Sequence, residues 1–365
     1  MSFFYMPAKV YEESEVVKNH AEEIMAFGKK ALIVTGKSSS RKNGSFDDVV
    51  SVLDEKNVSY VVFDDIEENP CVETVMKARD FGVSEGVDFV IGIGGGSAMD
   101  AAKAISLMIK HRDEDASYLY SAGADSSTLP IVLIPTTCGT GSEVTAVSVI
   151  TVPEKKTKKS ISHKIFADLA LIDGKYLKTA PASVLANTAI DALTHMIESY
   201  INTKSTPYSR MCVDAGLRTW RECLPVIKGE KEARDEDYMA LMRASMFAGM
   251  SIAHTATSIP HGLSYSLTYK LKIPHGKAVG YFTAGYLMKA SESDREYILK
   301  TAGFESVEDF QKVYLELCGS AEVPDEILIE AVEELSANKA KLALAPMKLS
   351  KDDLMELAFV TKKKA

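Results

Sequence analysis

The first half of the chain alternates short, mostly apolar runs with segments of helical spacing, and this alternation constrains the fold more than any other feature. Residues 31–35 form an apolar run closed by Gly36, and residues 45–56 carry valine and leucine at helical spacing. Further strand-like runs lie at residues 59–63, 89–93, 131–134 and 169–172. Such runs are typical of strands buried on both faces, and their alternation with helices predicts a parallel, doubly wound α/β sheet.

The pattern changes near residue 178. From Pro181 onward the chain has long segments with helical spacing and no convincing strand. The clearest of these segments lie at residues 183–201, 207–224, 237–253 and 325–338. A chain of 365 residues is also too long for one ordinary core. We therefore predict an α/β domain over residues 1–178 and an all-helical domain over residues 179–365.

Composition excludes several classes of partner. The formal net charge is −9, which argues against nucleic acid or an anionic membrane surface as the main partner. No window reaches the ~18 apolar residues that a membrane span needs, and the first residues do not resemble a signal peptide. The five cysteines are scattered without a C-x-x-C pair, so neither a disulfide framework nor a zinc-thiolate site is indicated. We expect a cytoplasmic protein that acts on small molecules.

A glycine-rich turn follows the run at residues 89–93. Gly94, Gly95, Gly96 and Ser97 lead directly into residues 98–104, a strong helix start. Backbone N–H groups and the helix dipole at such a turn favour a phosphate, and glycine lets the backbone approach it closely. The spacing departs from G-x-G-x-x-G, and a plain strand–helix turn is the alternative.

A second loop, at residues 134–143, follows the next strand-like run. It holds four hydroxyl side chains, including Thr136, Thr137 and Thr140, and two glycines. Ligands of open α/β sheets bind at the carboxyl ends of the strands, where this loop is expected. A hydroxyl-rich surface loop is the alternative, but two such loops at corresponding strand ends favour a cofactor site.

The helical half carries a candidate metal site. Asp191 and His195 are four residues apart, so a helix places both side chains on one face. An ordinary Asp–His hydrogen bond explains this pair equally well. His261 and His275 each stand between a proline and a glycine, where a side chain can be directed without helical periodicity. Three imidazoles and one carboxylate suit Fe²⁺ or Zn²⁺, with room for a substrate oxygen.

Together these motifs resemble those of the iron-containing (group III) alcohol dehydrogenases, along nearly the whole chain. The closest similarity is to the 1,3-propanediol and butanol dehydrogenase branch. The resemblance implies a Rossmann-like dinucleotide-binding domain (1–178) and a helical metal-binding domain (179–365), an architecture shared with dehydroquinate synthase. It implies the metal ligands Asp191, His195, His261 and His275. The residues it implies at the cofactor are Gly36, Lys37, Ser38, Ser39, Ser40, Gly94, Gly95, Gly96, Ser97, Asp100, Thr136, Thr137, Thr140 and Lys159.

One departure from the family pattern concerns proton transfer. Many members carry a further histidine four residues after the third metal ligand, where this chain has Tyr265. A phenol with a pKa near 10 is a poorer base at neutral pH. Tyr265 is therefore a candidate catalytic residue, with a place in the pocket wall as the alternative.

A second departure concerns the cofactor. Members that prefer NAD often have an aspartate just after the first strand, whereas this chain has Gly36, followed by Lys37, three serines and Arg41. The missing acid and the added bases predict NADP(H) in preference to NAD(H), because a 2′-phosphate would gain charge-assisted hydrogen bonds there.

We therefore expect a metal-dependent alcohol dehydrogenase and aldehyde reductase that transfers a hydride between a small primary alcohol or diol and NADP(H). Fe²⁺ is the expected metal, with Zn²⁺ as the alternative because a nitrogen and oxygen site binds Zn²⁺ more tightly. A glycerol dehydrogenase-like polyol oxidoreductase is the nearest rival. A dehydroquinate synthase-like lyase would need many positively charged side chains to hold a phosphorylated, acidic substrate. Residues 251–275 contain only two, Lys270 and Lys272. We expect a homodimer or larger homo-oligomer, with residues 3–6 pairing across a two-fold axis or forming a strand on their own sheet.

Overall fold

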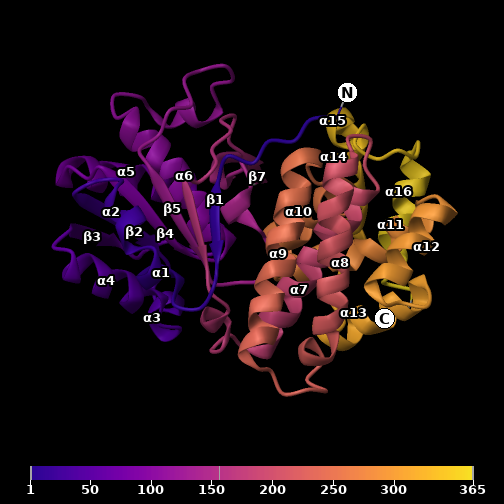
Figure 1. Cartoon of the computed structure of the whole chain (residues 1–365). Helices are drawn as coiled ribbons and strands as arrows, with labels where there is room; N and C mark the ends of the chain where they lie inside the picture. The colour runs from indigo at the N-terminus through magenta and orange to yellow at the C-terminus, as the bar shows by residue number, and fades with distance from the viewer. Residues whose placement is uncertain (1, 156, 364–365) are drawn as a thin grey trace. The chain divides into compact units, whose positions relative to one another are not determined.

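The computed structural model describes residues 2–155 and 157–363 (Figure 1). They form two compact units. Within the described residues, the sheet unit comprises 6–137 and 141–180, and the helical unit comprises 2–5, 138–140 and 181–363. The domain boundary after residue 178 stays a prediction, because two short segments of the first half group with the helices.

Six parallel strands form the main sheet in the order β1-β8-β5-β4-β2-β3. Their bounds are β1 Lys9–Glu12, β2 Lys30–Thr35, β3 Ser59–Phe63, β4 Phe89–Gly94, β5 Ile131–Pro135 and β8 Leu169–Ile172. The five predicted strands are confirmed to within one residue at each end. β1 escaped prediction because its sequence, Lys-Val-Tyr-Glu, contains no apolar run.

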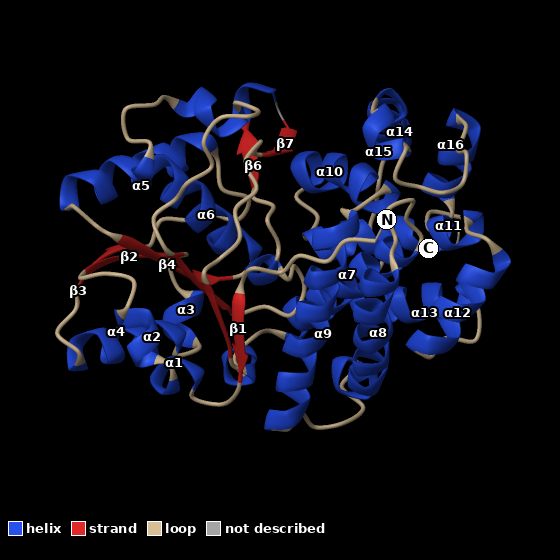
Figure 2. Ribbon diagram, turned by 45° about the horizontal axis from the view of Figure 1, so that its top comes forward, coloured by secondary structure: helices blue, strands red, loops and turns tan. Residues whose placement is uncertain are grey.

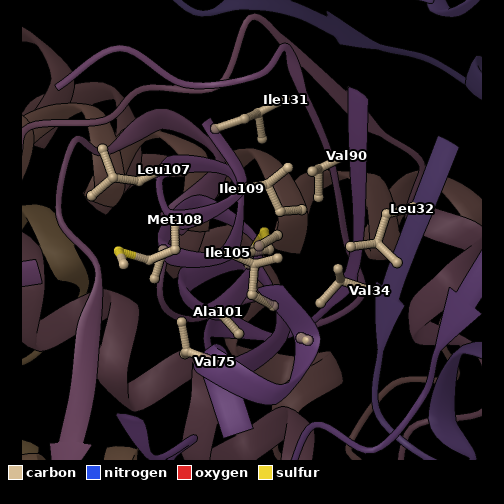
Figure 3. Close-up of a cluster of buried hydrophobic side chains, with 14 of the residues drawn as sticks. Leu32, Val34, Val75, Val90, Ala101, Ile105, Leu107, Met108, Ile109 and Ile131 are labelled. Carbon is tan, nitrogen blue, oxygen red and sulfur yellow. The ribbon is translucent and has the colours of Figure 1, made fainter. Parts of the chain in front are cut away.

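Helices cover both faces of the sheet. Figure 2 shows α5 and α6 on one side and α1 to α4 on the other. Leu32 and Val34 of β2 join the core beneath α5 and α6 (Figure 3), whereas Ala31 and Ile33 join the opposite core. Both faces of β2 are therefore buried, which explains its unbroken apolar run. The helix bounds are α1 Val16–Asn19, α2 Ala21–Met25, α3 Ser39–Lys42, α4 Ser45–Glu55, α5 Val72–Glu85 and α6 Gly96–Lys110.

A small antiparallel hairpin in the sheet unit was not predicted. Its strands are β6 Val149–Val152 and β7 Thr157–Ser160. All four residues of β7 are lysine, serine or threonine, so the hairpin lacks the apolar runs that mark the strands of the main sheet. β6 begins where the loop after β5 ends.

The helical unit is built around α7, Ala182–Tyr200, which packs against α8, α9 and α11. Trp220 of α8 is fully buried, and its indole Nε1 donates a hydrogen bond to the Ala189 carbonyl oxygen, 2.8 Å away. No strand occurs among the described residues after Pro181, as predicted. The other bounds are α8 Pro207–Ile227, α9 Asp235–Thr255, α10 Ile259–Leu271, α11 His275–Lys289, α12 Glu292–Ala302, α13 Val307–Cys318, α14 Asp325–Ala337, α15 Lys339–Leu342 and α16 Lys351–Phe359.

Residues 2–5 do not form a strand. They group with the helical unit, where the Phe4 ring stacks on His254 with ring centroids 4.7 Å apart, and Phe3 and Tyr5 stay exposed. Within the described part of the chain, no helix combines the length and the apolar character needed to cross a membrane.

Candidate metal centre and cofactor loops

Helix α7 places Asp191 and His195 on one buried face, as their spacing predicted. The Asp191 Oδ1 and His195 Nε2 atoms are 3.8 Å apart. On the other side of the ring, His195 Nδ1 lies 3.2 Å from the Gly139 carbonyl oxygen. A carbonyl only accepts, so Nδ1 carries the proton and the Nε2 lone pair is left towards Asp191.

His261 and His275 lie in the first turns of α10 and α11. A proline is tolerated directly before each histidine, because the first N–H groups of a helix have no intrahelical partner. The Nε2 atoms of His261 and His275 lie 3.5 Å and 3.8 Å from Asp191 Oδ1. Three helices thus bring three imidazoles to one carboxylate oxygen.

The arrangement fits a divalent cation. Asp191, His261 and His275 each offer a ligand atom, and these atoms lie within 4.8 Å of one another. Asp191 Oδ1 and His261 Nε2 are buried and have no hydrogen-bond partner in the described part of the chain. Buried polar atoms without partners are rare, and a cation between them would satisfy both.

The electrostatics of the cluster agree with this use. Burial raises the pKa of Asp191, but the imidazoles of His195 and His275 outweigh it and hold the pKa below its usual range. Burial lowers the pKa of His195, which favours the neutral ring that a metal requires. Burial also lowers the pKa of His261, but the carboxylates of Glu198 and Asp191 outweigh burial there and raise it.

Tyr265 lies four residues after His261 on α10 and is partly buried. This spacing places its side chain one helical turn beyond the candidate ligand. The catalytic role of Tyr265 stays a prediction.

In the sheet unit, the glycine turn joins β4 to α6. Gly94 has a φ of 151°, a conformation that L side chains rarely adopt, and α6 begins at Gly96. The Ser97 hydroxyl accepts a hydrogen bond from the Asn69 backbone N–H at 3.1 Å, so Ser97 also ties down a neighbouring turn. The turn therefore leads directly into a helix N-terminus, and its contact with a phosphate stays a prediction.

Thr136 and Thr137 follow β5, the neighbour of β4. The Thr136 backbone N–H donates to the Gly94 carbonyl oxygen at 2.9 Å, and a Cβ atom at Gly95 would lie 3.1 Å from the Thr137 hydroxyl oxygen. The two predicted loops are therefore adjacent. Thr140 groups instead with the helical unit.

The remaining predicted cofactor residues occupy two places. Gly36 and the run Lys37–Ser40 follow β2, and Ser40 is buried, with its hydroxyl accepting from Thr35 Oγ1 at 2.8 Å. Lys159 lies on β7, with its ammonium nitrogen 4.8 Å from the centre of the Tyr120 ring. Their contacts with a cofactor stay a prediction.

Two family models together match almost the whole chain. Residues 7–174 match the model described as iron-containing alcohol dehydrogenase, and residues 185–365 match the C-terminal part of the Fe-containing alcohol dehydrogenase family. The chain belongs to the iron-containing alcohol dehydrogenase family.

Individual relatives of this family agree. Long-chain-alcohol dehydrogenase 1 of Geobacillus thermodenitrificans is 30% identical, with 91% of this chain and 89% of the relative covered. The NADPH-dependent butanol dehydrogenase of Clostridium saccharobutylicum is 30% identical, with 85% and 78% covered. The crystal structure of an iron-containing alcohol dehydrogenase from Thermotoga maritima is 36% identical, with a TM-score of 0.91 and 99% of each chain covered. The protein is thus an oxidoreductase, and the predicted family and fold are confirmed.

Several groups at the sites of this alcohol dehydrogenase escaped the sequence reasoning. The Glu198 side chain accepts the Nδ1 hydrogen bond of His261, and the Gly139 carbonyl orients His195. Glu198 stands seven residues after Asp191, so helical spacing alone could have indicated it. Nothing in the sequence marks the Gly139 carbonyl, because backbone groups carry no side-chain signal.

Asp100 was predicted at the cofactor, but its carboxylate is engaged within the chain. It accepts hydrogen bonds from the Ser142 hydroxyl at 2.5 Å and the Val149 backbone N–H at 2.8 Å. These contacts favour a role in holding the loop after β5 in place. A contact of Asp100 with the cofactor stays a prediction.

Proposed function

We propose that this enzyme is a metal-dependent alcohol dehydrogenase and aldehyde reductase that transfers a hydride between a small primary alcohol or diol and NADP(H). The observation that carries the proposal is the convergence of three imidazoles on Asp191 Oδ1. The names of two relatives, a long-chain-alcohol dehydrogenase and an NADPH-dependent butanol dehydrogenase, support an alcohol substrate.

Asp191, His195, His261 and His275 would hold Fe²⁺, with Zn²⁺ as the alternative. When bound, such a cation supplies a Lewis acid that polarises the oxygen of the alcohol or aldehyde. The chain prepares the ligands in advance: the Gly139 carbonyl fixes the ring of His195, and burial keeps water from Asp191 and His261. Ligands that are already held in place reduce the entropic cost of binding the cation.

The glycine turn Gly94–Ser97 would hold the pyrophosphate of the cofactor. Its backbone N–H groups lie at the start of α6, where the helix dipole favours negative charge. Thr136 and Thr137 on the neighbouring strand end would add hydroxyl donors.

The NADP(H) preference rests on the residues that follow β2. Gly36 offers no carboxylate, and the Lys37 side chain is 79% exposed, so its ammonium group would be available to a 2′-phosphate. Lys37 now pairs with Asp65 at 3.1 Å, and Arg41 pairs with Asp64 at 3.1 Å. Exposed pairs of this kind contribute little to stability, because water and dissolved salt screen them. A phosphate can therefore displace them, because hydrogen bonds to charged groups contribute about 1.5–3 kcal/mol.

The metal assignment is tested by replacing each imidazole. His195→Ala, His261→Ala and His275→Ala should each lose the bound metal and nearly all turnover, while NADPH binding largely survives. Metal analysis of anaerobically purified protein and fluorescence titration with NADPH measure the two effects. His254→Ala, a histidine of the same unit outside the cluster, is the matched control. Full metal content in the three variants would refute the ligand set.

The cofactor preference is tested at Gly36. A Cβ atom there would lie 3.3 Å from the Ile66 carbonyl oxygen, which is tight, so Gly36→Asn serves as the control for size. Wild type should favour NADP(H) in kcat/KM, and Gly36→Asp should erode that preference by about 5–150-fold, equivalent to ~1–3 kcal/mol. A wild-type enzyme that favours NAD(H) would refute this interpretation of the loop.

A further inference from the structure

Glu198 is a fully buried carboxylate. In the described residues its hydrogen bonds all come from the N-terminal end of α10, from the cap residue Ser258 and from His261. Its Oε1 atom accepts the backbone N–H groups of Ser258 at 3.2 Å and His261 at 3.0 Å. Its Oε2 atom accepts a hydrogen bond from Nδ1 of the His261 ring. One carboxylate therefore holds both the backbone and the side chain of a single histidine.

The position of Glu198 is unusual on physical grounds. Burying a carboxylate carries a large free-energy penalty unless hydrogen bonds or opposite charges offset it. Among the described residues no lysine or arginine lies within ion-pair distance of Glu198; its ion-pair partner is His261. Lys341, the nearby base, donates instead to Thr257 Oγ1 at 2.8 Å. Two of the three hydrogen bonds that the carboxylate accepts in the described residues therefore come from His261, and the third comes from the Ser258 backbone.

We infer that Glu198 is a positioning residue that sets the tautomer and orientation of His261 for metal binding. This inference rests on the proposed function, in which His261 is a ligand. With the proton held on Nδ1 by Glu198, the Nε2 lone pair points to the region of Asp191 Oδ1, 3.5 Å away. A carboxylate behind a ligand histidine also raises the basicity of the ring.

The isosteric change to glutamine tests this role sharply. A glutamine has one oxygen and one NH₂ group where Glu198 has two acceptors. If the oxygen accepts the two backbone N–H groups, the NH₂ group faces His261 Nδ1 and forces the proton onto Nε2, which then cannot bind a metal. In the opposite orientation the NH₂ group faces the backbone N–H donors of Ser258 and His261, which leaves these donors without an acceptor. Both orientations therefore weaken metal binding by His261.

The experiment measures Co²⁺ affinity by competition with a chromophoric chelator, together with the visible absorption of the Co²⁺ protein. Glu198→Gln should weaken Co²⁺ binding by about 10–100-fold, as loss of an outer partner of a ligand does. Glu198→Asp keeps the carboxylate and should recover part of the affinity. The matched control is Ser199→Ala, which removes another buried bond of α7, the one that Ser199 Oγ accepts from Thr255 Oγ1 at 3.0 Å. This control should lower the melting temperature and keep wild-type affinity.

Three outcomes decide the matter. Wild-type affinity in Glu198→Gln, with binding lost in His261→Ala, would overturn the positioning role alone. Equal loss of affinity in Glu198→Gln and Ser199→Ala would show a merely structural role and also overturn it. Unchanged affinity in His261→Ala would overturn the ligand set and the inference together. If Glu198→Gln does not fold, ¹⁵N NMR of the metal-free wild type decides: a neutral His261 ring with its proton on Nδ1 supports the positioning role, and a proton on Nε2 overturns it.

Discussion

Lys103 is a fully buried lysine that holds the loop after β5. Its ammonium group donates to the carbonyl oxygens of Ser142 at 2.7 Å, Thr145 at 2.9 Å and Val147 at 2.9 Å. Burial lowers the pKa of Lys103 to about 8, although nearby Asp100 and Glu143 oppose the shift. Burial likewise raises the pKa of the Glu143 carboxyl to about 7, against the opposing charge of Lys103. Two buried groups therefore change charge close to neutral pH.

A prediction at this scale concerns Glu143. Between the usual pKa of 4.5 and the folded value of about 7, the folded state keeps a proton that the unfolded state has lost. Stability therefore falls as pH rises through this window. Glu143→Gln cannot ionise, so its melting temperature relative to wild type should rise from pH 5 to pH 8 by roughly 2–6 °C, the size of a ~1–2 kcal/mol effect. Thermal melts at both pH values measure it, with exposed Glu154→Gln as the control. A difference that is the same at both pH values would contradict the prediction.

At the scale of elements, His261 and His275 each stand near the start of a helix and are followed by a glycine. The space available for a larger side chain differs between these two glycines. A Cβ atom at Gly276 would overlap the backbone carbonyl oxygen of Asn187, so α11 approaches α7 closely. A Cβ atom at Gly262 would lie 2.7 Å from Leu335 Cδ1, the end of a flexible side chain that can move aside. The His–Gly pairs look alike in sequence but differ in what surrounds them.

Alanine at these two positions should therefore act differently. Gly276→Ala should destabilise the protein by about 1–3 kcal/mol or more, because backbone must move, and should weaken metal binding through the shift of His275. Gly262→Ala is the matched control, with the same change in helix propensity and a smaller loss. Urea unfolding of the metal-free variants and Co²⁺ titration provide the comparison. Equal stability of the two variants would contradict the close packing of α7 and α11.

At the scale of the whole molecule, the sequence predicts those features that a regular spacing of residues marks. Apolar runs revealed five strands, and the Asp191–His195 spacing revealed half of the candidate metal site. β1 was missed because an edge strand with charged ends carries no such run. Helical spacing puts Glu198 on the face of Asp191, but its contact with His261 forms only on folding and could not be predicted. The contacts by which Lys103 holds the loop after β5 likewise form only on folding. Likewise, no sequence signal groups residues 138–140 with helices that come more than forty residues later.

The pairing of β1 with β8 has a consequence for synthesis on the ribosome. Lys9 pairs with Leu169, so about 160 further residues must be synthesised before β1 can pair with β8, its neighbour among the described strands. At about 5–20 residues per second, that delay is roughly 8–30 s. During this time β2, β3, β4 and β5 can already pair, while the edge of β5 that will receive β8 is still open. The nascent chain therefore exposes an unpaired strand edge, which is where a chaperone would protect it from pairing with another chain.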